Sequence, residues 1–325
     1  MTTETLQDNK SQMEENRRFQ ILALDGGGIK GLFSVQILAF FEKDHNVNIA
    51  DHFDLIAGTS TGGLIALGLA SGMTAKDIAN FYVTEGPNIF PSSPRRWMQH
   101  WFYRKYSQGP LEKALKDVFG EHRTISDLTK QIIVPSYDLG RGKVRIFKTP
   151  HHPRLARDGR VKLWCVGLAT TAAPTYFPAT RCVDGARLID GGIWANNPAM
   201  IAALEAKSML GASLSNIYIL SIGTTRETKK RPNYLDAGGK LRWAVQAADV
   251  IMEAQSSSVL GQLRHLLPET NVTRIDAVAP AQLFRLDNVN AQDLTGWASS
   301  ESREAGPRAK PFFDHIAEPF KALEG

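Results

Sequence analysis

Short apolar runs alternate with helical patterns at the start of the chain. Residues 19–24 (FQILAL) and 53–58 (FDLIAG) have the length and the nearly continuous apolar character of buried strands. Residues 29–43 and 61–71 instead repeat apolar side chains at helical spacing. Strands that are apolar on both faces are typical of parallel sheets covered by helices. The pattern therefore predicts a layered α/β fold with a mostly parallel sheet.

The rest of the chain continues this alternation. Residues 130–139 and 143–149 flank a Gly-Arg-Gly turn and predict a hairpin. The remaining predicted elements are a short strand ending at Asp190, a helix that starts near Pro198, a strand at 217–223, mostly helical structure over 238–267, and strands at 273–278 and 283–287. Neither a repeat nor a linker interrupts the pattern. We therefore expect one domain over residues 19–325, preceded by a flexible polar lead at 1–18.

Composition and charge narrow the class of protein. The 325 residues are 43% hydrophobic and 22% charged, which is ordinary for a globular protein. No apolar run is long enough to cross a bilayer and no secretion signal is visible, so we expect a cytoplasmic protein. A net charge of +5 is too mild to indicate a DNA or RNA polymer, but it suits anionic lipid or a nucleotide. Cys165 and Cys182 lack metal-ligand spacing, so neither a zinc site nor a disulfide framework is expected.

A glycine-rich loop, LDGGGIKG, follows the first predicted strand. It formally contains the dinucleotide-binding pattern G-x-G-x-x-G, but the second strand does not end in the acidic residue that would hold a ribose and runs directly into TSTGG. Successive glycines also expose backbone amides at a helix N-terminus, where they stabilise a developing negative charge. On this hypothesis the amides of Gly26, Gly27 and Gly28 form an oxyanion hole and Lys30 adds a positive charge. The alternative is a tight turn that needs glycine only for its backbone conformation.

The second glycine-flanked turn is GTSTG at residues 58–62. Between a buried strand and a helix, G-x-S-x-G is typical of a nucleophile elbow, in which Gly58 and Gly62 permit the sharp turn that exposes Ser60. We interpret Ser60 as a nucleophile; the alternative is a simple helix cap.

A serine nucleophile needs a neighbouring group that accepts its proton. None of the eight histidines follows a strand in a glycine-flanked turn, whereas Asp190 does, with Gly191 and Gly192 directly after it. Asp190 is therefore the candidate general base, although an ordinary Asp-Gly turn is an alternative. A Ser-Asp-His triad that uses His265 or His315 is a competing hypothesis, as is a nucleotide-sensing module without chemistry.

Together these motifs resemble the patatin-like phospholipases. The chain matches that family in a D-G-G-G-x-[KR]-G loop at 25–31, a G-x-S-x-G elbow at 58–62, an A-x-x-A-P-x-x-F-P block within 169–179 and a D-G-[GA] motif at 190–192. The resemblance implies a three-layer α/β/α fold and a lipid acyl hydrolase with a Ser60–Asp190 dyad, without metal or cofactor. An aspartate with an ordinary pKa is a poor base at pH 7, so we expect burial to raise the pKa of Asp190 or its role to be partly orienting.

Within the family, the chain looks most like bacterial effectors of cyclic-oligonucleotide antiphage systems. That resemblance implies a cyclic dinucleotide as activator rather than cofactor and phospholipid of the inner leaflet as substrate. It also implies peripheral membrane association when the enzyme is active, and ligand-dependent assembly into a homo-oligomer.

Contacts to lipid or nucleotide are predicted from a mixture of basic and aromatic residues. Residues 94–106 interleave cations with rings, a pattern that suits a membrane interface, a nucleotide or an ordinary core helix. Paired histidines in a proline-flanked loop are a second candidate for phosphate contact. The candidate residues are Arg95, Arg96, Trp97, Trp101, Arg104, His151 and His152.

Overall fold

A seven-stranded sheet forms the centre of the protein. The computed structural model describes residues 17–91, 105–227, 233–279, 284–285, 288–289 and 291–323. The strands of the central sheet are β1 (Phe19–Leu24), β2 (Leu55–Gly58), β3 (Gln131–Asp138), β4 (Lys143–Lys148), β5 (Leu188–Asp190), β6 (Ile217–Ile222) and β8 (Val272–Ile275). Their order is β4-β3-β2-β1-β6-β8, and β5 pairs with β3. Only β4 and β5 run antiparallel to their neighbour, so the mostly parallel sheet is confirmed.

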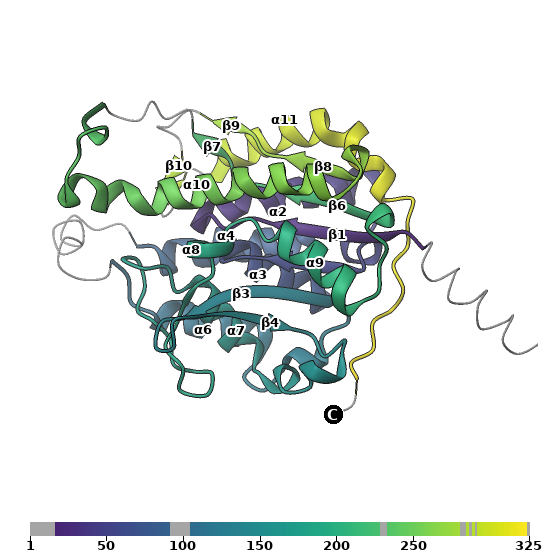
Figure 1. Cartoon of the computed structure of the whole chain (residues 1–325), viewed down its shortest axis with the longest axis horizontal. Coiled ribbons are helices and arrows are strands. Elements are labelled where there is room, and N and C mark those ends of the chain that lie inside the picture. The colour runs from purple at the N-terminus through teal and green to yellow at the C-terminus, as the bar shows by residue number, and fades with distance from the viewer. Residues whose placement is uncertain are drawn as a thin grey trace, which may run out of the picture.

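Helices cover both faces of this sheet (Figure 1). They are α2 (Gly31–His45), α3 (Thr61–Ala70), α4 (Ala75–Ile89), α6 (Gly109–Phe119), α7 (Leu163–Thr171), α8 (Gly192–Ala195), α9 (Ala199–Met209), α10 (Lys240–Leu266) and α11 (Ala291–Ala309). Leu22 and Leu24 pack against α2, α3, α4 and α11, whereas Ile21 and Ala23 face α9 and α10. This alternation makes three layers, α/β/α. None of the described helices is long and apolar enough to cross a membrane.

Short two-stranded sheets complete the described structure. They pair β7 (Arg226–Glu227) with β9 (Val278–Ala279), and β10 (Phe284–Arg285) with β11 (Asn288–Val289). Of the predicted strand at 283–287 the structure describes residues 284–285, which form β10, and the predicted strand at 273–278 divides between β8 and β9.

The boundaries at the chain start also differ from prediction. The helix expected from residue 29 begins with a 3-10 turn, η1 (Gly28–Lys30), before α2. Residues 1–16 of the predicted flexible lead lie outside the described residues. Its last two residues are held in place, because Arg17 pairs with Asp54 at 2.7 Å and the guanidinium of Arg18 lies over the ring of Tyr218.

The topology brings two strand ends together along one edge of β3. Strand β2 pairs with the first part of β3 and ends at Gly58, next to Ser60. Strand β5 pairs with the last part of β3 and runs in the opposite direction, with Asp190 opposite Ser136. Because the two strands point toward each other, the turns that follow them meet.

Close packing at the start of α3 gives a stability prediction. A Cβ atom at Gly62 would overlap the backbone carbonyl of Leu24, whereas one at Gly261 in α10 would meet nothing within 4 Å. We expect Gly62→Ala to lower the free energy of unfolding by about 2 kcal/mol or more, because backbone must move. Gly261→Ala, the control, should raise it by up to about 1 kcal/mol through helix propensity. Denaturant unfolding measures both, and equal effects would contradict this packing.

Candidate active site

Ser60 lies in a strained turn between β2 and α3. Its backbone has φ 54° and ψ −120°, a conformation that costs about 1–3 kcal/mol for a residue with a side chain. A Cβ atom at Gly58 would overlap the carbonyl of Gly62, so these two positions require glycine. The amide of Leu64, one helical turn on, donates to the carbonyl of Ser60 at 3.1 Å. The serine thus stands at the N-terminus of the buried helix α3.

Two threonines hold the turn. The amide of Ser60 donates to Thr170 Oγ1 at 2.9 Å, and that hydroxyl donates to the carbonyl of Pro135 at 2.8 Å. Thr59 Oγ1 donates to the carbonyl of Ala195 at 2.6 Å. The amide of Ser60 is therefore occupied by the scaffold, which fixes the turn against β3.

Asp190 lies within hydrogen-bond distance of Ser60. Ser60 Oγ donates to Asp190 Oδ2 at 2.6 Å, and the amide of Gly192 donates to Asp190 Oδ1 at 2.7 Å. Both side chains are largely buried, with Ser60 9% and Asp190 6% exposed. A Cβ at Gly191 would overlap the carbonyl of Pro135, so glycine there allows this turn to lie directly on β3. The two candidate catalytic residues are thus brought together with a fixed orientation.

Burial makes Asp190 a stronger base than an exposed aspartate. Desolvation raises the pKa of Asp190 to about 6, against the opposing hydrogen bonds from Ser60 and the Gly192 amide. The carboxyl group therefore remains mostly ionised at pH 7, while its affinity for a proton is well above normal. The source of basicity that the sequence left open is burial.

The glycine loop lies beside the serine, but one of its three candidate amides is occupied. The amide of Gly26 donates to the carbonyl of Asn196 at 3.0 Å, so the expectation that it points at an oxyanion is wrong. A Cβ at Gly26 would lie 3.3 Å from Ser60 Cβ, which places the loop against the nucleophile. The amides of Gly27 and Gly28 have no acceptor among the described residues. They are the donors that remain for a developing negative charge.

The segment after β6 supports this loop from the side. Thr224 Oγ1 donates to the carbonyl of Gly26 at 3.1 Å, and a Cβ at Gly27 would overlap the Thr224 side chain. Lys30 Nζ donates to the carbonyl of Thr225 at 3.4 Å. Lys30 therefore ties the glycine loop to the β6 segment, a scaffold contact that the sequence did not predict.

A buried ion-pair network lies at the base of the loop. Arg274 on β8 makes a bidentate contact to Asp25, at 2.9 and 2.6 Å, and also contacts Asp276 at 3.0 Å. Burial alone would lower the pKa of Arg274, but Asp25 and Asp276 together raise it above its ordinary value. Sequence reasoning missed Arg274; its one signal was a charged residue within the predicted strand at 273–278.

The two histidines of the triad hypothesis, His265 and His315, lie away from Ser60 and Asp190. His315 contacts Asp54, which precedes β2, at 3.0 Å, whereas Ser60 follows the same strand. His265 is exposed and stands thirteen residues after Met252, the residue of α10 that approaches Gly192, or about 20 Å along the helix. Neither histidine bonds to Ser60 or Asp190, so within the described residues these two side chains pair without a histidine.

Of the other predicted contact residues the structure describes only His151 and His152, and neither bonds to Ser60 or Asp190. The side chain of His151 is 1% exposed and bonds to Glu205 at 3.0 Å, so it is a structural residue rather than a phosphate contact. His152 Nδ1 accepts from the amide of Arg154 at the start of a 3-10 turn. The remaining candidates, Arg95, Arg96, Trp97, Trp101 and Arg104, lie outside the described residues.

Helix α10 contacts the turn at Asn196 and Asn197, which follows Asp190 and holds the glycine loop. It crosses the face of the sheet in Figure 1, and Ser256 accepts from Asn196 Nδ2 at 3.1 Å. Gln255 bonds to both the amide and the carbonyl of Asn197, at 2.9 and 3.3 Å. Because Asn196 holds the amide of Gly26, α10 is connected through one residue to the glycine loop.

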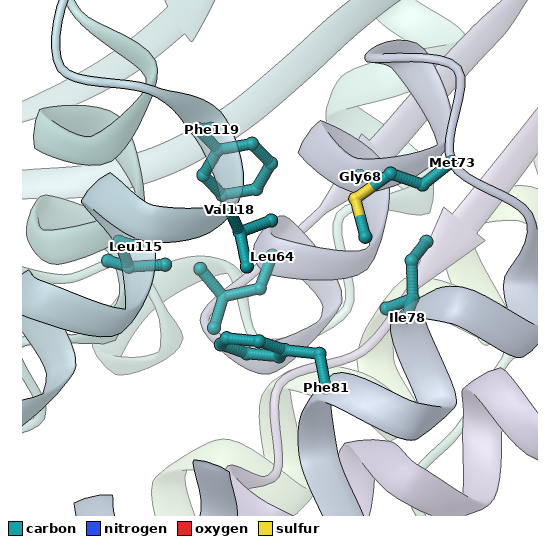
Figure 2. A pocket seen from close by; sticks show the side chains of 8 residues that line it. All are labelled: Leu64, Gly68, Met73, Ile78, Phe81, Leu115, Val118 and Phe119. Carbon is teal, nitrogen blue, oxygen red and sulfur yellow. The ribbon is translucent and has the colours of Figure 1, made fainter. Parts of the chain in front are cut away.

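An apolar cavity lies between α3, α4 and α6, on the other side of the sheet (Figure 2). Its lining includes Leu64, Phe81 and Phe119, and its volume is about 10 Å³. That volume is close to the minimum for one water molecule and far below the size of an acyl chain. In this conformation the cavity is a packing gap beside α3 rather than a substrate site.

The chain matches a family model described as patatin-like phospholipase over residues 22–203. It is 34% identical to the cGAMP-activated phospholipase of Escherichia coli (strain TW11681), covering 94% of this chain and 96% of that protein. It is 36% identical to the cGAMP-activated phospholipase of Pseudomonas aeruginosa (strain BWHPSA011 / Pa011), covering 94% and 92%. The solved structure of VipD from Legionella pneumophila matches with a TM-score of 0.50 at 12% identity, over 94% of this chain and 68% of that one. That last likeness concerns the fold alone.

The raised pKa of Asp190 has a measurable effect on stability. Because burial raises the pKa to about 6 from an ordinary 3.8, the unfolded chain loses this proton first as the pH rises. The free energy of unfolding therefore falls as the pH rises between these two pKa values, and above pH 6 it is lower by up to about 3 kcal/mol. Asp190→Asn removes the buried charge, so this variant should be more stable than the parent at about pH 8 and equal to it at about pH 4.

Denaturant unfolding at these two pH values measures the difference. The control is Asp117→Asn on the exposed face of α6, which should change the free energy of unfolding little at either pH. Equal stability of Asp190→Asn and the parent at the higher pH would mean that the carboxylate carries no burial penalty.

Proposed function

Since this chain belongs to the patatin-like phospholipase family, we propose that it hydrolyses the acyl esters of membrane phospholipids with a Ser60–Asp190 dyad. The family makes it a serine acyl hydrolase. The observation that carries the assignment of residues is the 2.6 Å hydrogen bond from Ser60 Oγ to a buried Asp190 that is oriented by the Gly192 amide. Nucleophile, base and orienting group are then all present without a histidine.

In the first step Asp190 Oδ2 accepts the proton of Ser60 Oγ, and the oxygen attacks the carbonyl carbon of the ester. The carbonyl oxygen becomes an oxyanion, which the amides of Gly27 and Gly28 stabilise together with the N-terminus of the following helix. Collapse of this intermediate breaks the bond between the acyl carbon and the glycerol oxygen. The proton held on Asp190 passes to that leaving oxygen, which leaves an acyl group on Ser60.

Water completes the cycle. Asp190 accepts a proton from a water molecule that attacks the acyl carbon, and a second oxyanion forms in the same place. When this intermediate collapses, the bond to Ser60 Oγ breaks and the serine recovers its proton from Asp190. The product is a free fatty acid, and the pKa of about 6 allows Asp190 to take up and return the proton at neutral pH.

The proposal extends to regulation. Two relatives named cGAMP-activated phospholipases match this chain over at least nine tenths of both lengths. We assign a cyclic dinucleotide of that class as activator and phospholipid of the inner leaflet as substrate. The biological role that we propose with it is antiphage defence. In this role a nucleotide signal activates the enzyme, which then hydrolyses the membrane lipids of its own cell. The similarity of the relatives supports this regulation, and the geometry of the site supports the chemistry.

The experiment that tests the proposal is fatty-acid release from phospholipid vesicles with and without cGAMP. We expect release only with the nucleotide, and we expect Ser60→Ala to reduce it by about three orders of magnitude or more. A matched control is Ser257→Ala on the exposed side of α10, which should keep full activity. Release that is independent of nucleotide would make this an ungated lipase, and full activity of Ser60→Ala would refute the dyad.

The base also predicts a pH dependence. Because only ionised Asp190 can accept the proton of Ser60, kcat/KM should rise about tenfold per unit below pH 6 and level off above it. The rate on a soluble ester between about pH 4.5 and 8 measures this limb. Warming should leave its midpoint nearly unchanged, as for a carboxyl group. A midpoint that moves to lower pH on warming would indicate an imidazole base and favour the triad.

A further inference from the structure

The hairpin between β3 and β4 extends past the edge of the sheet at which Ser60 lies. Asp190 stands opposite Ser136, and β3 continues to Asp138 before the turn at 139–142. At about 3.3 Å per residue, the turn lies about 10 Å beyond the level of Asp190. The tip of this hairpin therefore projects from the same edge as the candidate active site.

Two aliphatic side chains are exposed at this tip. Leu139 is 45% exposed and Val144 is 56% exposed. Val144 pairs with Tyr137 near the end of the hairpin, and Leu139 is the first residue of the turn after β3. The two apolar side chains thus form one small patch at the end of the hairpin.

Basic side chains surround the patch. Arg141 and Lys143 lie in and next to the turn, and the carbonyl of Arg187 accepts from the amide of Leu139 at 2.8 Å, which brings a third cation from a separate loop. All three side chains belong to exposed residues. The acidic residue Asp138, at the end of β3, accepts from the amides of Gly140 and Arg141 at 2.9 and 3.1 Å. Its charge is therefore used within the turn, with Arg141 Nε 3.9 Å away.

We propose that this hairpin-tip patch (Leu139, Arg141, Lys143, Val144 and Arg187) docks the enzyme on an anionic lipid bilayer. Leu139 and Val144 enter the headgroup region, and the three cations pair with lipid phosphates. The inference rests on the proposed function and deepens it, because it names the surface that brings Ser60 to its substrate.

Charge and area favour a bilayer over a protein partner. Residues 141–187 contain ten Lys or Arg and two Asp, in a chain whose totals are 38 and 33. Such an excess of cations on the segment that supplies the patch complements an anionic surface. Two aliphatic side chains offer far less than the roughly 800 Å² that each partner buries in a stable protein interface. A bilayer needs no such area, since insertion and headgroup pairing act at each residue.

The test compares two matched double variants in a Ser60→Ala background, where hydrolysis does not alter the vesicles. One variant is Leu139→Ser/Lys143→Ser at the tip. The other is Leu204→Ser/Lys207→Ser on α9, which removes the same residue types from another exposed surface, Leu204 being 50% exposed. Co-sedimentation measures binding to vesicles of phosphatidylethanolamine with phosphatidylglycerol, and to neutral phosphatidylcholine vesicles, each with and without cGAMP.

We expect the tip variant to bind phosphatidylglycerol vesicles at least about tenfold more weakly than the parent, and the α9 variant to bind like the parent. Binding of the parent should fall with added salt and be weaker on neutral vesicles. Unchanged binding of the tip variant would overturn the proposal. Loss of cGAMP binding with vesicle binding intact would overturn it too, and would make the patch a nucleotide site.

The same pairs with Ser60 intact separate this inference from the proposed function. The tip variant should hydrolyse a soluble short-chain ester at the parental rate while its rate on vesicles falls at least about tenfold. A parental ester rate also shows that the variant is folded. If the parent releases no fatty acid from any ester, the proposed function fails. If the parent is active but the tip variant and the α9 variant hydrolyse vesicles at the same rate, only the docking surface fails.

Discussion

The short hydrogen bond between Ser60 and Asp190 depends on backbone segments that lie closer together than side chains allow. Gly62 lies on the end of β1, Gly58 on the first turn of α3 and Gly191 on β3, each without room for a Cβ atom. Ser60, between Gly58 and Gly62, has a positive φ, and Asp190, directly before Gly191, is buried. The strain and the buried charge both cost free energy, and the apolar core on both faces of the sheet offsets that cost.

Much of the fold could be predicted because its signals are local. The apolar run at 19–24 predicted both ends of β1 to the residue. The Gly-Arg-Gly turn predicted the hairpin, and each end of β3 and β4 lies within one residue of its predicted position. The turns that carry Ser60 and Asp190 were also recognisable, since each is a strand followed by glycines. What the sequence could not give is that β2 and β5 point toward each other along β3, because that depends on strand pairing across the whole domain.

The partners of the site residues were the least predictable part. Asp25 pairs with Arg274, 249 residues away, and His151, which the sequence suggested as a phosphate contact, pairs with Glu205. The glycine loop presented three equivalent amides in the sequence, yet the carbonyl of Asn196 occupies the amide of Gly26. Tertiary hydrogen bonds of this kind leave no periodic trace, because one polar group satisfies another wherever the fold happens to place them.

Those same tertiary contacts connect the two chemical halves of the site. Asn196 follows the short helix α8 that begins two residues after Asp190, and its carbonyl holds the glycine loop. Its side chain and the backbone of Asn197 are in turn bonded to Ser256 and Gln255 on α10. A displacement of α10 at these residues must therefore either break these partly buried hydrogen bonds or carry the Asn196 turn with it. In the second case the proposed oxyanion donors, the amides of Gly27 and Gly28, move relative to Ser60, which couples the position of α10 to the geometry on which the proposed hydrolysis depends.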